Sequence, residues 1–151
     1  MSQQTTHPAA GAITALMDRY RAAWKANDPA ALKRCWDTAR APLYLAEEIE
    51  ETLGDWDAIE RYWAMNEGLH ADVALSFTEP VFTDLAEGLV MGAWRMDWTI
   101  QFNDKPAMSG WNRVAAVYRE APDSWRLAAW IEAPLAAVTY VRKLYEERAG
   151  A

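Results

Sequence analysis

The spacing of apolar residues divides this chain into a helical first half and a second half built from strands. Apolar side chains recur every three or four residues over residues 11–26 and 56–68, which predicts two amphipathic helices. The run Asn27-Asp28-Pro29 is typical of a helix start, so a short helix is expected between these two. A last helix is expected over residues 134–148, and residues 1–10 are expected to form a flexible tail.

Apolar and polar residues alternate from residue 70 onward, which is the pattern of strands with one buried face. Turn residues divide this alternation into runs over residues 73–82, 88–102, 108–119 and 125–132, and a short extended run precedes them at 42–45. Pro80 indicates a bulge or an edge position, because proline cannot donate to a sheet ladder. Helices followed by consecutive antiparallel strands predict one α+β domain over residues 11–148, with a cone-shaped, curled antiparallel sheet packed on the N-terminal helices.

The longest run, residues 88–102, carries the candidate chemistry. Met96, Trp98, Ile100 and Phe102 point to one side of this strand, and Arg95, Asp97, Thr99 and Gln101 point to the other. If the second side lines a closed pocket, Arg95 and Asp97 form a candidate acid–base pair. If it faces water, they form an ordinary surface ion pair. We expect the pocket arrangement, with Glu132 joining the pair.

Charge and composition narrow the classes of partner. A net charge of -7 without a basic patch argues against nucleic acid and against anionic membranes. One cysteine, Cys35, excludes an internal disulfide, and together with the lack of a signal-peptide pattern it predicts a cytoplasmic protein. Nine tryptophans and six tyrosines among 151 residues predict either a core rich in rings or a cavity lined by them.

The order of elements from Ile13 to Glu132 resembles the nuclear-transport-factor-2-like (NTF2-like) superfamily, which includes SnoaL-like cyclases, ketosteroid isomerases and limonene-epoxide hydrolases. Arg95-Met96-Asp97, Trp130-Ile131-Glu132 and Tyr44 are similar to the Arg-x-Asp, Trp-x-Asp and Tyr of the limonene-epoxide hydrolases. The resemblance implies an arginine that bridges two carboxyl groups, one acting as base and one as acid. Glu132 replaces the second Asp of that pattern, and Ala46 stands where the family has a water-holding Asn, which favours chemistry without a water nucleophile.

The remaining candidates are expected to bind the substrate. Tyr44 is expected to serve a substrate oxygen, beside the catalytic Asp97, Arg95 and Glu132. The expected substrate-binding residues are Trp130, Asn112, Tyr118, Thr99, Trp63 and His70. Glu47 and Glu48 could reach the mouth of the pocket, but they belong to an acidic run, which is usually a solvated surface. Two distant histidines, no cysteine cluster and no glycine-rich phosphate loop predict neither a metal nor a cofactor.

These residues favour a cofactor-independent lyase or isomerase that acts on a hydrophobic aromatic or polycyclic molecule. A deformylating lyase of lignin-derived diaryl compounds is one example of such an enzyme. Two alternatives remain: an epoxide hydrolase using Arg95, Asp97 and Glu132, and a non-catalytic module for ligand binding or dimerisation. Because the sheet has two faces with large side chains, a homodimer or homotrimer is expected.

Overall fold

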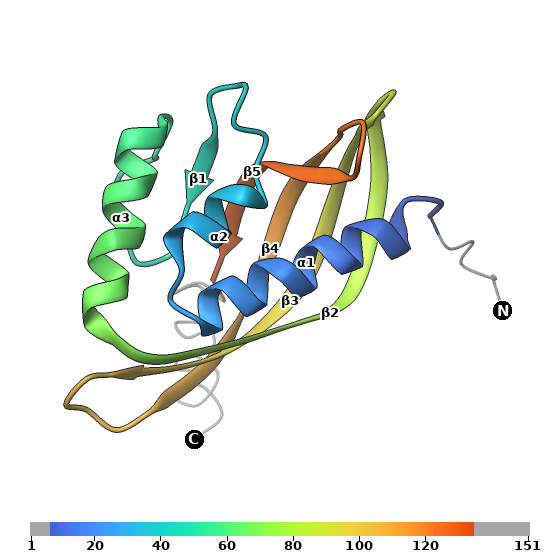
Figure 1. Cartoon of the computed structure of the whole chain (residues 1–151). Coiled ribbons are helices and arrows are strands. Elements are labelled where there is room, and N and C mark those ends of the chain that lie inside the picture. Colours follow the sequence, from blue (N-terminus) through green and yellow to red (C-terminus); the bar gives the residue numbers. More distant parts are fainter. Residues whose placement is uncertain (1–6, 135–151) are drawn as a thin grey trace, which may run out of the picture.

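The computed structural model describes residues 7–134, except for the side chains of residues 70 and 71 (Figure 1). Helices come first and strands follow, as the alternation along the chain predicts. In chain order the elements are α1 (Ala10–Lys25), α2 (Pro29–Arg34), β1 (Leu43–Leu45), α3 (Trp56–Leu69), β2 (His70–Ala86), β3 (Leu89–Phe102), β4 (Met108–Glu120) and β5 (Trp125–Ala133). The α+β class is therefore confirmed, while the helix expected over residues 134–148 lies outside the described residues.

The helix starts follow from their capping residues. The Asp28 carboxylate accepts a hydrogen bond from the Ala31 N–H at 2.9 Å, and Pro29 occupies the first turn of α2. Asp55 caps α3 in the same way by accepting from the Ala58 N–H at 2.8 Å. The expected end of α3 at Gly68 is one residue early, because the helix continues to Leu69 before the chain enters β2.

The sheet has the order β1-β5-β4-β3-β2, and its four long strands are antiparallel neighbours. The short strand β1 pairs with β5 in parallel, so the prediction of a purely antiparallel sheet is wrong and the sheet is mixed. In this register Tyr44 lies beside Trp130 on the same face. A segment near residue 44 is thereby fixed next to the end of β5.

Pro80 lies at an irregularity in the edge strand β2, as its position in the sequence predicts. The pairing of β2 with β3 shifts between Thr78 and Val81, and Glu79 takes a positive φ of 54°. Bulges of this kind bend a strand and increase its twist. The bend contributes to the curl with which the long strands wrap around α1 (Figure 1).

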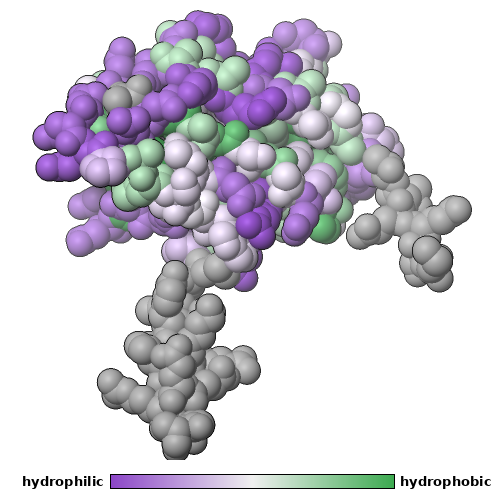
Figure 2. All heavy atoms as spheres, turned by 90° about the horizontal axis from the view of Figure 1, so that it is seen from below, coloured by the Kyte–Doolittle hydropathy of each residue, from purple (hydrophilic) through white to green (hydrophobic). Residues whose placement is uncertain are grey.

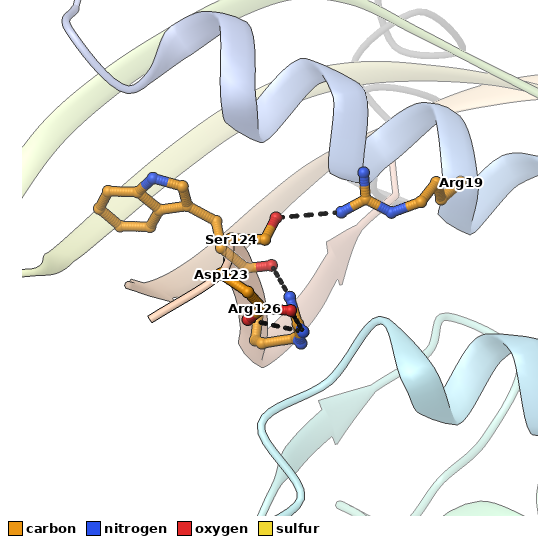
Figure 3. Close-up of polar contacts among 5 residues, drawn as sticks. Arg19, Asp123, Ser124 and Arg126 are labelled. Atoms are coloured by element: carbon orange, nitrogen blue, oxygen red, sulfur yellow. Dashed lines mark hydrogen bonds and ion pairs between the residues drawn. The ribbon is translucent and has the colours of Figure 1, made fainter. Parts of the chain in front are cut away.

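The concave side of the sheet is covered by α1, which buries Ile13, Leu16, Met17 and Tyr20 against it (Figure 1). The turn between β4 and β5 is tied to the same helix by polar contacts (Figure 3). In that contact Arg19 donates to the Ser124 hydroxyl at 3.3 Å. The helix and the last hairpin are therefore linked across one end of the sheet.

Apolar side chains also reach the surface. Figure 2 shows patches of hydrophobic residues between hydrophilic ones on the face seen from below in Figure 1. Among the described residues, the exposed large side chains include Met91, Met108 and Trp111 on β3 and β4. Within the same part of the chain, no helix combines the length and apolar character needed to cross a membrane.

Gly110 gives a direct test of how tightly the inner face is packed. A Cβ atom at Gly110 would lie 2.5 Å from the Trp98 indole, which covers this glycine across the β3–β4 pair. We expect Gly110→Ala to displace the indole and to lower the free energy of unfolding by about 1–3 kcal/mol, the usual range for overpacking. Gly68→Ala is the matched control, because its Cβ meets no atom within 4 Å. Urea unfolding of both variants checks this; equal stability for Gly110→Ala and the parent would contradict it.

Candidate functional site

A cavity of about 320 Å³ lies between the inner face of the sheet and the helices. Its walls are mostly apolar and rich in rings, and its polar groups gather where β1, β4 and β5 meet. The lining residues are Trp24, Tyr44, Glu47, Glu48, Ile49, Tyr62, Met65, Asn66, Leu69, Val73, Leu75, Met96, Trp98, Ile100, Phe102, Met108, Asn112, Trp130 and Glu132. An apolar chamber with a few converging polar groups is the usual form of a small-molecule site.

Arg95 and Asp97 lie on the opposite face of β3 from this cavity, so the prediction that they meet Glu132 inside it is wrong. Met96 and Trp98 alternate with them and line the cavity instead. The side chains of Arg95 and Asp97 are 36% and 42% exposed and form an ion pair, with 2.8 Å between Nη2 and Oδ1. The guanidinium also lies 4.3 Å from the centre of the Trp111 ring. The hydrogen bond from Arg95 lowers the pKa of Asp97, the opposite of what a base working near neutrality needs.

Two further candidates are also placed outside the cavity wall. Thr99 shares the outer face with Asp97, and its hydroxyl lies 2.7 Å from the Ser109 hydroxyl. Tyr118 is buried in the core, where its hydroxyl accepts from Trp94 Nε1 at 2.8 Å and donates to Met17 Sδ at 3.2 Å. Both side chains make hydrogen bonds to neighbours in the fold and neither belongs to the cavity wall, so this cavity gives no support to their expected contact with substrate.

Trp63 supports the site from behind and is not part of the cavity wall. Its ring packs against Trp36 and Tyr44, with both centroid distances at 6.4 Å. His70 is the first residue of β2 and pairs with Phe102. The side chain of His70 is outside the described part of the molecule, so its expected contact with substrate stays a prediction.

Glu132 is the candidate that the structure places in the cavity with a full set of partners. Its Oε1 accepts from Trp130 Nε1 at 2.8 Å, and its Oε2 accepts from the Glu47 N–H at 3.2 Å and from Asn112 Nδ2 at 3.5 Å. Burial, together with the charges of Glu48 and Glu47, outweighs the hydrogen bonds and raises the pKa of Glu132 to about 7. This carboxyl group can both release and accept a proton near neutral pH.

Glu47 and Glu48 line the cavity at this polar end and are also exposed to solvent, as expected for an acidic run. The amide of Asn112 donates to Glu47 Oε2 at 3.1 Å, and the Tyr62 hydroxyl donates to Glu48 Oε1. Both glutamates come just after β1, whose parallel pairing with β5 brings them to the end of β5 where Glu132 lies. Only knowledge of that pairing reveals them, because local composition gives no sign of it.

Tyr44 lines the cavity close to these groups. Burial is the main cause of a pKa far above the ordinary value for its phenol, and the neighbouring Tyr20, Tyr62 and Glu132 raise it further. Tyr62 is shifted in the same direction, mainly by burial and then by Glu48. Both phenols therefore stay protonated at physiological pH and can act as hydrogen-bond donors.

These groups are suited to moving protons. Within residues 7–134, no group of three or more His, Cys, Asp or Glu side chains is arranged to hold a metal ion. The cavity instead combines one carboxyl group whose pKa is near neutrality with two neutral phenols and an apolar chamber. Such a set can take a proton from a carbon acid and stabilise the oxygen that gains charge.

No family model matches this chain, and no curated protein matches it in sequence. Solved structures do match. A candidate aromatic ring hydroxylase from Novosphingobium aromaticivorans has a TM-score of 0.77 and 15% identity over 88% of this chain and 93% of its own. A candidate scytalone dehydratase from the same species has a TM-score of 0.75 and 9% identity over 83% of both chains. A candidate dehydratase of the NTF2-like family from Streptomyces avermitilis has a TM-score of 0.73 and 12% identity over 85% of this chain and 98% of its own. At these identities the likeness shows the fold, which is NTF2-like.

The raised pKa of Glu132 predicts a pH-dependent stability. In the unfolded chain this carboxyl releases its proton near its ordinary pKa of 4.5, and in the folded protein near 7. The folded state binds more protons between these values, so the stabilisation is complete below the lower pKa and is lost as pH rises through the higher one. Glu132→Gln has no carboxyl group at this position and therefore does not lose this stabilisation. We expect its free energy of unfolding to rise by about 2 kcal/mol relative to that of the parent as the pH goes from about 5.5 to about 8.5. Urea unfolding of both proteins at both pH values checks this. The same change in the free energy of unfolding in the parent and in Glu132→Gln would contradict it.

Proposed function

We propose that this protein is a cofactor-independent lyase or isomerase that acts on a hydrophobic aromatic or polycyclic molecule by proton transfer. The observation that carries the proposal is the Glu132 carboxyl group, held in an apolar cavity of about 320 Å³ with its pKa raised to about 7. A buried carboxyl group of this kind lowers stability at neutral pH, and perturbed groups in cavities are candidates for catalysis. Structural neighbours that are candidate dehydratases support the lyase class.

For a lyase, the cavity suggests elimination of water from an aromatic or polycyclic β-hydroxy ketone. The Glu132 carboxylate takes the proton from the carbon next to the carbonyl, and the electron pair moves onto the carbonyl oxygen. Tyr44 stabilises that oxygen with its hydroxyl hydrogen. As the carbonyl re-forms, the electron pair makes the carbon–carbon double bond and expels the β-hydroxyl group, which takes the proton back from Glu132 and leaves as water. Glu132 ends in its starting state, so the step balances without a cofactor.

An isomerase would use the same first step. With a β,γ-unsaturated ketone that step gives a dienolate, and Glu132 would then return the proton to a different carbon of it, so that no group leaves. In both cases the role given to Arg95 and Asp97 from the sequence passes to Glu132 with Tyr44, because only the latter two lie in the cavity. The epoxide-hydrolase alternative loses its support for the same reason, since Arg95 and Asp97 are on the opposite face from Glu132.

The test is turnover of aromatic and polycyclic β-hydroxy ketones, followed by the absorbance of the conjugated ketone that forms. We expect Glu132→Gln to lower turnover by about two orders of magnitude or more, which is the usual contribution of a general base. Tyr44→Phe is expected to lower turnover less, because it removes one hydrogen bond and leaves the base. Asp97→Asn is the matched control, a carboxyl-to-amide change on the outer face, and should leave turnover unchanged. Full activity in Glu132→Gln would overturn the role of Glu132 as the base, and a parent protein that turns over none of these ketones would favour a non-catalytic binding module.

A further inference from the structure

The charges on the cavity wall are of one sign. Within the described residues, the lining contains three glutamates, Glu47, Glu48 and Glu132, and neither lysine nor arginine. The influences on the Glu132 carboxyl group include repulsion from the other two glutamates. An anionic ligand would add to this repulsion, whereas a cation would relieve it.

The hydrogen bonds at the polar end of the cavity also favour a cationic ligand. Three donors there, Trp130 Nε1, Asn112 Nδ2 and the Tyr62 hydroxyl, are already directed to the glutamate oxygens. Because the Asn112 amide turns its nitrogen to Glu47 and Glu132, its Oδ1 is buried without a hydrogen-bond partner, in a residue only 1% exposed. Two donors without a partner also belong to lining residues, Asn66 Nδ2 and Trp98 Nε1, but these atoms are themselves buried. At the glutamates the groups open to a ligand are acceptors, so the matching ligand group there is one with several donors.

The rest of the wall suits an aromatic cation. Rings of Trp24, Tyr44, Tyr62, Trp98, Phe102 and Trp130 line the chamber. Aromatic faces attract cations, and the attraction is stronger where water is excluded. They also bury a large apolar area when another ring packs against them.

We propose that the cavity selects a ligand with an aromatic or fused-ring body and a protonated amine, and that the ammonium group lies at Glu47 and Glu48. The proposal rests on the proposed function only in placing the substrate in this cavity. The ring body fills the apolar chamber, and Glu132 stays available for proton transfer. An ammonium group here also favours the ionised form of Glu132, so it keeps the base ready for the reaction.

The experiment compares three probes that share one naphthalene ring and differ in charge: naphthylmethylamine, naphthylmethanol and naphthoate. Binding to the whole chain is measured by calorimetry at about pH 8, where the amine is protonated and the carboxylate probe is ionised. We expect the amine to bind at least about tenfold more tightly than the alcohol, and the carboxylate to bind most weakly. The double variant Glu47→Gln, Glu48→Gln should reduce the preference for the amine several-fold, with Glu132 as the remaining carboxyl group in the cavity, while the alcohol binds as before. Asp97→Asn, a carboxyl group on the outer face, should change none of the three affinities.

The outcomes separate this inference from the proposed function. If the alcohol binds as well as the amine, or the carboxylate binds best, the charge preference is wrong while the lyase or isomerase proposal stands. If the amine is preferred but Glu132→Gln keeps full turnover, the charge preference holds and the proposed reaction is wrong. If none of the three probes binds, the cavity is not a site for this class of ligand and the inference is overturned.

Discussion

The alternation of side chains along β3, on a sheet that curls around α1, is the constraint on which the rest of the molecule depends. One set of side chains must face the enclosed side, and the other must face outward. Met96 and Trp98 take the inner side, because burying large apolar groups is favourable and burying the Arg95–Asp97 pair would remove both charges from water. The inner set then makes the wall of an apolar chamber, and the outer set becomes a surface ion pair stacked on Trp111.

The chemistry of the chamber comes from a second constraint, the parallel pairing of β1 with β5. This pairing brings the segment that follows β1 against the end of β5, so that the Glu47 N–H reaches the Glu132 carboxylate. It also puts Tyr44 beside Trp130, whose indole holds the other oxygen of Glu132. The carboxyl group keeps good hydrogen bonds there, yet burial and two neighbouring glutamates leave its proton affinity high.

Much of the fold and part of the site could be predicted from the sequence. Periodicity predicts each described helix and strand to within a few residues, because amphipathic spacing and caps such as Asp28 are local signals. Trp130, Asn112, Tyr44 and Glu132 are rightly expected to line the cavity. The local sequence could not show which face of the sheet Arg95 and Asp97 occupy. Alternation assigns the side chains of β3 to two faces, but it does not say which face is enclosed. Glu47 and Glu48 were not among the expected site residues, although the sequence allows them at the mouth of the pocket. The pairing that brings them to Glu132 joins segments some eighty residues apart, and neither segment alone predicts it.

The central claim is that Glu132 is a largely buried carboxyl group whose pKa lies near neutrality. NMR titration of protein with carbon-13 in the glutamate side-chain carboxyl groups tests it most directly, with Glu132→Gln used to assign the signal. The account predicts that the Glu132 signal titrates with a pKa of about 7, well above the ordinary 4.5, and is absent from the variant. A Glu132 signal that titrates at about 4.5, like a solvated glutamate, would contradict the account.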